Sequence, residues 1–160
     1  MSFEKAQKHL LKYINKDKIL VFSSSSATVE LAAAAVGCEP ARIAKTLSFK
    51  VLDECVLIVM AGDAKIDNKK FKNYFHIKAK MLTPDEALSN TGHAVGGVCP
   101  FGVPDNVKVY LDESLKRFST VFPACGSANS AAELSLDELC QASGSLGWVN
   151  VCKLIEIQTD

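Results

Sequence analysis

The segment of residues 91–102, which reads TGHAVGGVCPFG, constrains the fold more than any other part of the chain. It holds four glycines and one proline among apolar residues, with neither a helical nor an alternating period. Glycine loses backbone entropy inside a helix or strand and proline lacks a backbone donor, so the segment is a poor interior for either element. Gly96 and Gly97 allow positive φ and let a ligand approach the main chain where a Cβ would block it. Such an apolar loop is unlike a surface connector, and it predicts a wall of backbone N–H and C=O groups that holds a small polar group.

Length and charge indicate one globular domain without a global electrostatic field for nucleic acid. The chain has 160 residues, 48% of them hydrophobic, which is enough for one buried core, so we expect a single domain over residues 1–160. The 18 basic and 18 acidic residues balance, which leaves a local basic patch as the route to nucleic acid. No apolar run has the length of a membrane span, and the N-terminus lacks an apolar signal core. We therefore expect a cytoplasmic protein with no membrane partner.

The cysteines lie far apart in the sequence. There are six, at positions 38, 55, 99, 125, 140 and 152, with no C-x-x-C pair and no paired histidine pattern beside them. This spacing argues against a metal site and against a thiol redox protein. Several have apolar neighbours, where a free cysteine packs as a small hydrophobic side chain. We expect reduced, buried thiols and no metal ion.

Helical and strand patterns alternate along the chain without a linker-like break. Helices are predicted over residues 3–14, 28–36, 40–44, 68–74, 84–90 and 136–143. Strands are predicted over residues 19–22, 46–49, 55–60, 107–111 and 148–157, of which the continuous apolar run 55–60 is typical of a central strand buried on both faces. The pattern as a whole predicts a mixed α/β (α+β) domain of about six or seven strands and about five helices.

Capping residues mark several helix starts. Ser2 precedes the first predicted helix, and the serines at 23–26 offer N-cap hydroxyls to the second. Thr83 and Ser135 are each followed three residues later by a glutamate, which is the pattern of a capping box. Both boxes predict firm helix starts.

No familiar catalytic motif is present. The sequence contains no G-x-S-x-G elbow, no Walker loop, no G-x-G-x-x-G and no H-E-x-x-H. His93 and Cys99 lie in the same loop and are conceivable as a base and a nucleophile. Their separation along an irregular segment and the apolar neighbours of Cys99 favour packing over catalysis.

Lys45 and the glycine-rich segment remain as candidates for chemistry. Amides of the loop near Gly96 and Gly97 can stabilise an oxyanion or bind a carbonyl. Lys45 is expected at the C-terminal end of the short helix 40–44, just before the strand 46–49. Lysines are usually solvated, which favours an ordinary surface role. Its apolar neighbours favour a functional one, since they would hold the stem while the ammonium reaches into a cleft.

Several short motifs, taken in order, resemble those of one known family. They are TVELAAAAVG at 28–37, RIAKTL at 42–47, Gly62-Asp63, the glycine-rich segment, YLDESL at 110–115, ACGS at 124–127 and LSLDEL at 134–139. In this order the chain resembles, over nearly its whole length, the YbaK/prolyl-tRNA-synthetase editing-domain family. The lysine motif and the G-G-x-x-P-x-G loop are the most specific parts of the match.

The resemblance implies a fold, an activity and a set of site residues. The implied fold is a strongly curved mixed sheet, or partial barrel, surrounded by helices. The implied activity is that of a free-standing deacylase, which hydrolyses the ester of a mischarged aminoacyl-tRNA without a metal or organic cofactor. Lys45 matches the functionally critical lysine, and it is assigned to catalysis together with Gly96 and Gly97. The residues assigned to substrate binding are Thr46, His93, Val98, Pro100, Phe101, Gly102, Gly126, Ser127 and Asn129.

The segment after residue 123 bears on the amino acid that is removed. Family members that clear cysteinyl-tRNA tend to carry a serine and an aspartate where this chain has Ala124 and Ala131, which weakens a cysteine-specific interpretation. The Gly126-Ser127-x-Asn129 pattern resembles members that clear alanine or other small residues. Ser127 and Asn129 would then face the amino group or the adenosine, or alternatively they satisfy a turn, which these residue types favour.

The expected partners are the acceptor end of an aminoacyl-tRNA and an aminoacyl-tRNA synthetase. A local basic cluster could meet the acceptor stem or form an ordinary solvated face; it consists of Lys65, Lys69, Lys70, Lys72, Lys78 and Lys80. The competing hypothesis is a tRNA- or synthetase-binding adaptor on the same fold that performs no hydrolysis.

Overall fold

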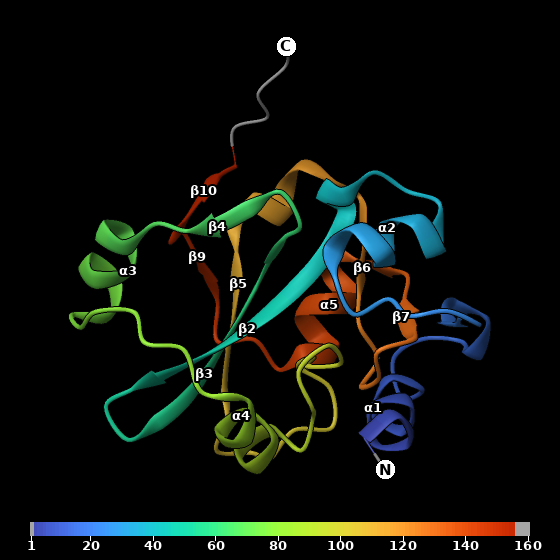
Figure 1. Cartoon of the computed structure of the whole chain (residues 1–160), viewed down its shortest axis with the longest axis horizontal. Helices are drawn as coiled ribbons and strands as arrows, with labels where there is room; N and C mark the ends of the chain where they lie inside the picture. Colours follow the sequence, from blue (N-terminus) through green and yellow to red (C-terminus); the bar gives the residue numbers. More distant parts are fainter. Residues whose placement is uncertain (1, 156–160) are drawn as a thin grey trace.

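A curled sheet of six strands forms the centre of the computed structural model, which describes residues 2–155 (Figure 1). Its strand order is β8-β6-β2-β3-β5-β9. The strands are β2 (Ile43–Val51), β3 (Glu54–Ala61), β5 (Lys108–Asp112), β6 (Thr120–Pro123), β8 (Leu134–Ser135) and β9 (Trp148–Val149). β2 and β3 form an antiparallel hairpin, whereas β2–β6, β3–β5 and β5–β9 are parallel pairs. The sheet is therefore mixed, as the sequence predicts.

Two short ribbons extend the sheet at its ends. β1 (Ile19–Val21) pairs with β7 (Ser130–Ala132), and β4 (Ala64–Ile66) pairs with β10 (Cys152–Leu154). Both pairs are antiparallel and join segments far apart in the sequence. The sequence patterns do not predict β4, β6, β7 or β8, which have only two to four residues each.

Five α-helices surround the sheet within residues 2–155. They are α1 (Ser2–Leu10), α2 (Val29–Val36), α3 (Asn68–Phe75), α4 (Pro84–Thr91) and α5 (Leu136–Ser143), with 3-10 turns η1 (Lys16–Lys18), η2 (Pro40–Arg42) and η3 (Glu113–Arg117). Both predicted capping boxes form: the Thr83 and Ser135 side chains each accept from the backbone of a glutamate whose carboxylate binds back. No helix in this part of the chain combines the length and the apolar character needed to span a membrane.

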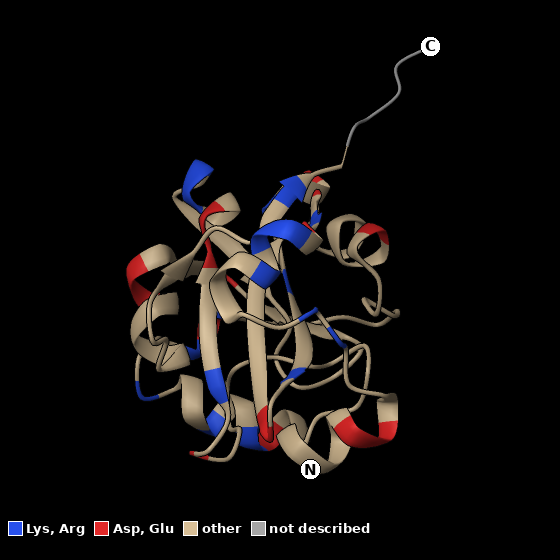
Figure 2. Cartoon of the chain, turned by 90° about the vertical axis from the view of Figure 1, so that its left-hand side faces the viewer, with Lys and Arg blue, Asp and Glu red and all other residues tan. Residues whose placement is uncertain are grey.

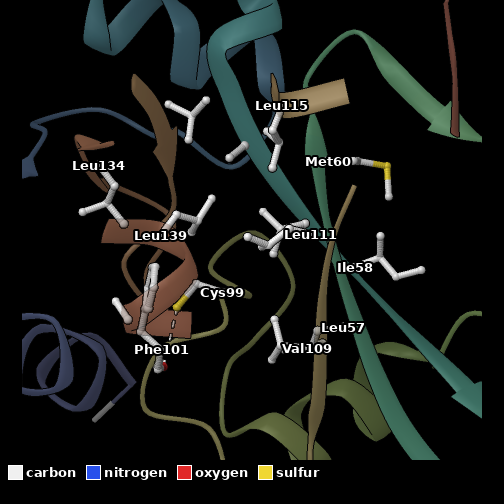
Figure 3. Packing of buried hydrophobic residues seen from close by; sticks show 14 of the residues in the cluster. Leu57, Ile58, Met60, Cys99, Phe101, Val109, Leu111, Leu115, Leu134 and Leu139 are labelled. Carbon is white, nitrogen blue, oxygen red and sulfur yellow. Dashed lines mark hydrogen bonds between the residues drawn. The ribbon is translucent and has the colours of Figure 1, made fainter. Parts of the chain in front are cut away.

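The hydrophobic core lies against β3. Every residue of this strand after Glu54 is buried, as predicted for a central strand. Leu57, Ile58 and Met60 pack with side chains from β5, η3 and α5 (Figure 3). This rigid centre fixes β2, the strand that carries Lys45, along one edge of β3.

The predicted helix at 40–44 is wrong in its extent. Only the η2 turn forms, and β2 begins at Ile43. Ala44 pairs with Ala61 on β3 and with Pro123 on β6, and this pairing on both sides extends the backbone. Lys45 therefore lies inside a strand and not at the end of a helix.

Three other boundaries differ from the predictions. Thr28, and not the serines at 23–26, caps α2, since its hydroxyl accepts from Leu31 N–H. The first helix ends at Leu10, after which a tightened turn follows because Tyr13 N–H bonds the Leu10 carbonyl. The strand predicted over 148–157 divides into β9 and β10, because the two halves pair with different strands; residues 156 and 157 lie outside the described residues.

Candidate active site

A cavity of about 320 Å³ opens beside the first half of β2. Its walls come from β2, from the loop before α2 and the first turns of that helix, from residues 81–82, from the glycine-rich segment and from β6 and β7. The lining residues are Ser26, Ala27, Thr28, Val29, Ala32, Ile43, Ala44, Lys45, Thr46, Leu47, Ser48, Met81, Leu82, Val95, Gly96, Val98, Phe122, Ala124, Ser130 and Ala131. The fold thus brings Lys45 to the same cavity as part of the glycine-rich segment, although Lys45 and Gly96 are 51 residues apart in the sequence.

Among the described residues that line this cavity, Lys45 is the one whose side chain carries a charge. It is half-buried, and its Nζ donates to the Gly62 carbonyl at 3.5 Å. Burial lowers the pKa of the Lys45 ammonium from its ordinary value, while the negative charges of Asp63 and Glu30 oppose this shift. A partly desolvated cation in an apolar cavity interacts strongly with an oxyanion or a phosphate.

The first half of the glycine-rich segment forms a tight turn against the cavity. Gly97 N–H donates to the Ala94 carbonyl at 2.9 Å, so this amide is already committed. The N–H groups of Gly96 and Val98 bond no carbonyl or side chain within residues 2–155, and both residues line the cavity. Gly96 has φ of +97°, and a Cβ there would lie 3.2 Å from that of Ala27. A Cβ on Gly97 would lie 2.7 Å from Ser127 N, so both positions need glycine, for different neighbours.

The second half of the segment does not reach the cavity. Pro100 and Phe101 are buried, and Phe101 points into the core beside Cys99 (Figure 3). A Cβ on Gly102 would lie 2.9 Å from the Lys5 carbonyl carbon, so this residue allows close contact with α1. These three residues, expected to bind substrate, instead contact the core and α1.

His93 is buried beneath the loop. Its Nε2 lies 2.7 Å from the Phe101 carbonyl oxygen and its Nδ1 lies 2.5 Å from the Ser2 hydroxyl, which also donates to the Gly126 carbonyl. Burial lowers the pKa of the imidazole, partly opposed by the hydrogen bond to the Phe101 carbonyl. His93 therefore ties the glycine-rich segment to α1, and it does not line the cavity.

The turn at 126–129 stands behind the cavity wall. Ser127 Oγ lies 2.6 Å from Ser130 Oγ and donates to Asn129 Oδ1 at 2.9 Å, while Asn129 Nδ2 donates to the Phe22 carbonyl. These hydrogen bonds are the ones expected if Ser127 and Asn129 stabilise a turn, which was one of the two alternatives given by the sequence. Gly126 packs against Ser2, whose carbonyl oxygen a Cβ would meet at 2.5 Å. Ser130, the partner of Ser127, lines the cavity itself.

Two hydroxyl groups in the cavity lining have no hydrogen-bond partner within the described residues. They are Ser26 Oγ and Thr46 Oγ1, and both atoms are buried. An unsatisfied buried hydroxyl costs about 1–3 kcal/mol, so such groups mark places where a ligand can add a hydrogen bond. Thr46 was expected from the sequence. From the sequence, Ser26 was expected only to cap a helix. Its backbone N–H bonds the distant Ala128 carbonyl, so its neighbours in the sequence do not indicate that it lines a cavity.

Cys99 and His93 do meet, with Sγ and Nε2 3.5 Å apart. Cys99 is fully buried, and this burial raises the pKa of its thiol far above the ordinary value. A protonated, inaccessible thiol is a poor nucleophile, so the pair packs rather than reacts. All six cysteines are free, and residues 2–155 hold no group of three or more histidine, cysteine or acidic side chains placed for a metal ion.

Comparison with known proteins identifies the family to which this geometry belongs. Residues 23–142 match the model of the aminoacyl-tRNA editing domain. The chain belongs to this family. The editing domain identified here is 53% identical over 154 residues to YwhH, an uncharacterized protein of Bacillus subtilis (strain 168), and the match covers 96% of this chain and 98% of that protein.

Relatives connected with prolyl-tRNA synthetase also match this editing domain. It is 32% identical over 102 residues to a proline–tRNA ligase of Thermosipho melanesiensis, a match that covers 63% of this chain but only 18% of the ligase. A crystal structure described as that of a proposed trans-editing enzyme for prolyl-tRNA synthetase superposes with a TM-score of 0.85 at 27% identity, covering 95% of this chain and 97% of that one. The family and the fold inferred from the sequence motifs are confirmed.

Proposed function

We propose that this editing domain is a trans-editing hydrolase that removes a small amino acid, such as Ala, Ser, Thr or Cys, from mischarged tRNA, including the tRNA for proline. The observation that carries the proposal is a single cavity lined both by Lys45, with its lowered pKa, and by Gly96 and Val98 of the glycine-rich segment, in a chain of the aminoacyl-tRNA editing family. The ligase relatives and the trans-editing neighbour support the connection with proline. Such an activity belongs to the cytoplasm, where tRNA is aminoacylated.

The size of the cavity favours a small aminoacyl group. About 320 Å³ lies at the lower end of the volumes of small-molecule sites, and the walls are mostly apolar. The apolar side chains of Ile43, Phe122 and Val98 are part of these walls and would contact a short aminoacyl side chain. Ser26 and Thr46 offer two hydroxyl groups to the polar atoms of the aminoacyl ester.

The reaction needs positioning and charge stabilisation more than a strong nucleophile, because an aminoacyl ester is already activated. Water attacks the ester carbonyl; the bond from carbon to the ribose oxygen breaks, and the proton lost by water goes to that oxygen. The Gly96 and Val98 N–H groups, which bond no protein acceptor within residues 2–155, would donate hydrogen bonds to the developing oxyanion, a type of contact worth about 3 kcal/mol. The Gly97 amide shapes the turn.

Lys45 supplies the positive charge of the site. Its ammonium holds the phosphate or ribose of the terminal adenosine and polarises the ester. Among residues 2–155, the cavity lining includes no histidine, cysteine or acidic side chain, so the proton passes through water or through the neighbouring hydroxyl of the ribose. The remaining assigned residues act through these groups: Thr46 binds the aminoacyl group, while His93, Pro100, Phe101, Gly102, Gly126, Ser127 and Asn129 hold the loops that form the walls.

The acceptor stem would lie across the basic cluster of Lys65, Lys69, Lys70, Lys72, Lys78 and Lys80. Figure 2 views the side of the molecule that carries α3, where Lys and Arg positions lie on several neighbouring elements. None of these six lysines forms a salt bridge to a side chain of residues 2–155, although the Lys70 ammonium donates to Asn150 Oδ1 and to the Cys152 carbonyl. Their positive charges are therefore not neutralised by a carboxylate and can attract phosphates. The segment with Lys78 and Lys80 continues directly into Met81 and Leu82 of the cavity wall.

A deacylation panel tests the proposal. Alanyl, cysteinyl, seryl and threonyl esters of several tRNAs are incubated with the wild type, with Lys45→Ala and with Lys108→Ala, a matched variant of an exposed lysine on β5 that lies outside the cavity. We expect rapid hydrolysis of one or more esters, lost in Lys45→Ala and kept in Lys108→Ala. Measurable binding of tRNA without hydrolysis of any ester would replace the hydrolase by the adaptor hypothesis.

A further inference from the structure

The turn between β3 and β4 contacts the Lys45 side chain. In the β2–β3 register Lys45 lies opposite Met60, so Gly62 begins the turn two residues beyond the strand partner of Lys45, within reach of the long lysine side chain. Gly62 supplies the carbonyl that accepts the Lys45 ammonium. The position of this carbonyl therefore determines where the ammonium rests.

Close packing holds Gly62 on one side. A Cβ at this position would lie 2.1 Å from the Pro40 carbonyl oxygen and 2.8 Å from a Val29 methyl carbon. Only glycine allows the turn to approach η2 and α2 so closely. This contact fixes the turn from the side of the cavity.

An ion pair holds the turn on the other side. Arg117, on η3, donates to Asp63 through two nitrogens, with Nη1–Oδ2 at 2.9 Å and Nη2–Oδ1 at 2.5 Å. Its Nε donates to the Ser114 carbonyl at 2.9 Å, and the Ser114 hydroxyl accepts Ala61 N–H at 3.1 Å. η3 thus contacts the chain both before and after Gly62. The paired, planar geometry restricts the turn far more than one flexible contact does.

Charge adds to this geometry. The ionisable groups near Lys45 are Asp63 on the turn, Glu30 on α2 and Cys152 on β10. Burial raises the pKa of the Cys152 thiol, so the thiol stays neutral, and the two carboxylates provide the negative charge. The hydrogen bonds from Arg117 hold the pKa of Asp63 below its ordinary value and so keep it ionised. An ionised Asp63 favours the protonated form of Lys45 against the effect of burial.

We propose that Asp63 and Arg117 are positioning residues for Lys45: their ion pair fixes the Gly62 carbonyl that orients the ammonium, and Asp63 places a negative charge near it. The inference deepens the proposed deacylase and rests on it for its catalytic consequence. The pair is partly exposed, so solvent screens its charge, whereas its bidentate geometry still fixes the position of Asp63.

The test compares Asp63→Asn with Glu54→Gln. Glu54 pairs with Lys108 at the opposite end of β3 and gives a matched loss of one exposed ion pair. The Lys45 pKa is measured by NMR in protein labelled with ¹³C at lysine Cε, with Lys45→Arg to assign the signal. We expect a lower Lys45 pKa in Asp63→Asn, no change in Glu54→Gln, and partial recovery in Asp63→Glu.

Kinetics on the ester cleaved fastest provide the second readout. We expect kcat of Asp63→Asn to fall by about tenfold or more with little change in KM, and no further fall when Lys45 is already replaced by arginine. Arg117→Lys, which keeps the charge but not the paired geometry, should show a smaller fall. An unchanged Lys45 pKa, or a loss of kcat equal to that of Glu54→Gln, would overturn the inference. Absence of hydrolysis by the wild type would instead refute the deacylase, and the NMR comparison would still decide whether Asp63 controls Lys45.

Discussion

The two halves of the glycine-rich segment lie side by side in the sequence but contact different parts of the molecule. Val95, Gly96 and Val98 line the cavity, with Val95 largely exposed, whereas Cys99, Pro100 and Phe101 are buried in the core. The first half presents free amides, while the second is held by hydrogen bonds at His93 and by close packing on α1. The difference shows how an irregular loop can keep a fixed position at a cavity: its buried half holds in place the half that lines the cavity.

The largest expected effect is on stability, in the buried half. Phe101→Ala should lower the free energy of unfolding by about 3–5 kcal/mol, because it opens a cavity beneath the loop. Val95→Ala, in the exposed half, should change it by less than about 0.5 kcal/mol. Urea denaturation of both variants checks the comparison. Equal losses would show that the two halves do not differ in their contribution to the core.

The next effect is on activity, at the cavity. If the charged form of Lys45 is required, deacylation should decline as pH rises through a pKa that lies below 10.5, the ordinary value, because burial favours the neutral amine. Rates with the spontaneous hydrolysis subtracted measure this decline. In Lys45→Arg the decline should disappear from the accessible range, since the guanidinium stays protonated. A decline that persists in Lys45→Arg would belong to another group.

Glycine substitutions separate two constraints on the loop, namely close contact with a neighbouring segment at Gly97 and a positive φ at Gly92. Gly97→Ala places a Cβ 2.7 Å from Ser127 N, so the turn must move, and we expect losses of both activity and stability, the latter about 1–3 kcal/mol. Gly92→Ala has open space around its Cβ and only the strain of φ +79° at the end of α4, so about 1 kcal/mol or less is expected, with activity retained. Thermal unfolding and the deacylation rate of each variant provide the measurement.

The smallest effect is the pH dependence of stability from His93. The pKa of this histidine is lower in the folded state than the ordinary value of 6.5, so the unfolded chain binds its proton first as pH falls. Its contribution is therefore fully present above pH 6.5 and is lost as pH falls through the folded pKa. His93→Gln should remove this part of the acid dependence, measured by urea denaturation at several pH values. An unchanged dependence would assign it to other groups.

Local patterns predicted the parts of the fold whose stabilising contacts are close in sequence. The capping boxes at Thr83 and Ser135 form as predicted because donor and acceptor are three residues apart. The apolar run of β3 is buried on both faces as predicted, because no polar face is available to water. The error at 40–44 has the opposite origin: Pro40 starts a turn, but strand pairing of Ala44 with distant segments decides the conformation that follows.

The candidate site shows the same division. The sequence motifs, through the family resemblance, selected Lys45, Thr46, Gly96 and Val98, and these line one cavity. They also selected Pro100, Phe101 and Gly102, which the fold places in the core and against α1, because a motif does not distinguish a wall from its support. The sequence did not identify Ser26 as a lining residue, since its position depends on a backbone hydrogen bond to the distant Ala128.

The sequence by itself determined the family, the glycine positions of the loop and the lysine that gives the site its charge. These properties depend on residue type at a given position, which a sequence states directly. Only the tertiary structure decided which loop amides stay free, which half of the glycine-rich segment meets the cavity, and that Arg117 holds Asp63 beside Lys45. The lining of the cavity and the contact of Arg117 with Asp63 depend on residues dozens of positions apart, and the state of the loop amides depends on a turn whose residue types do not reveal its hydrogen bonds.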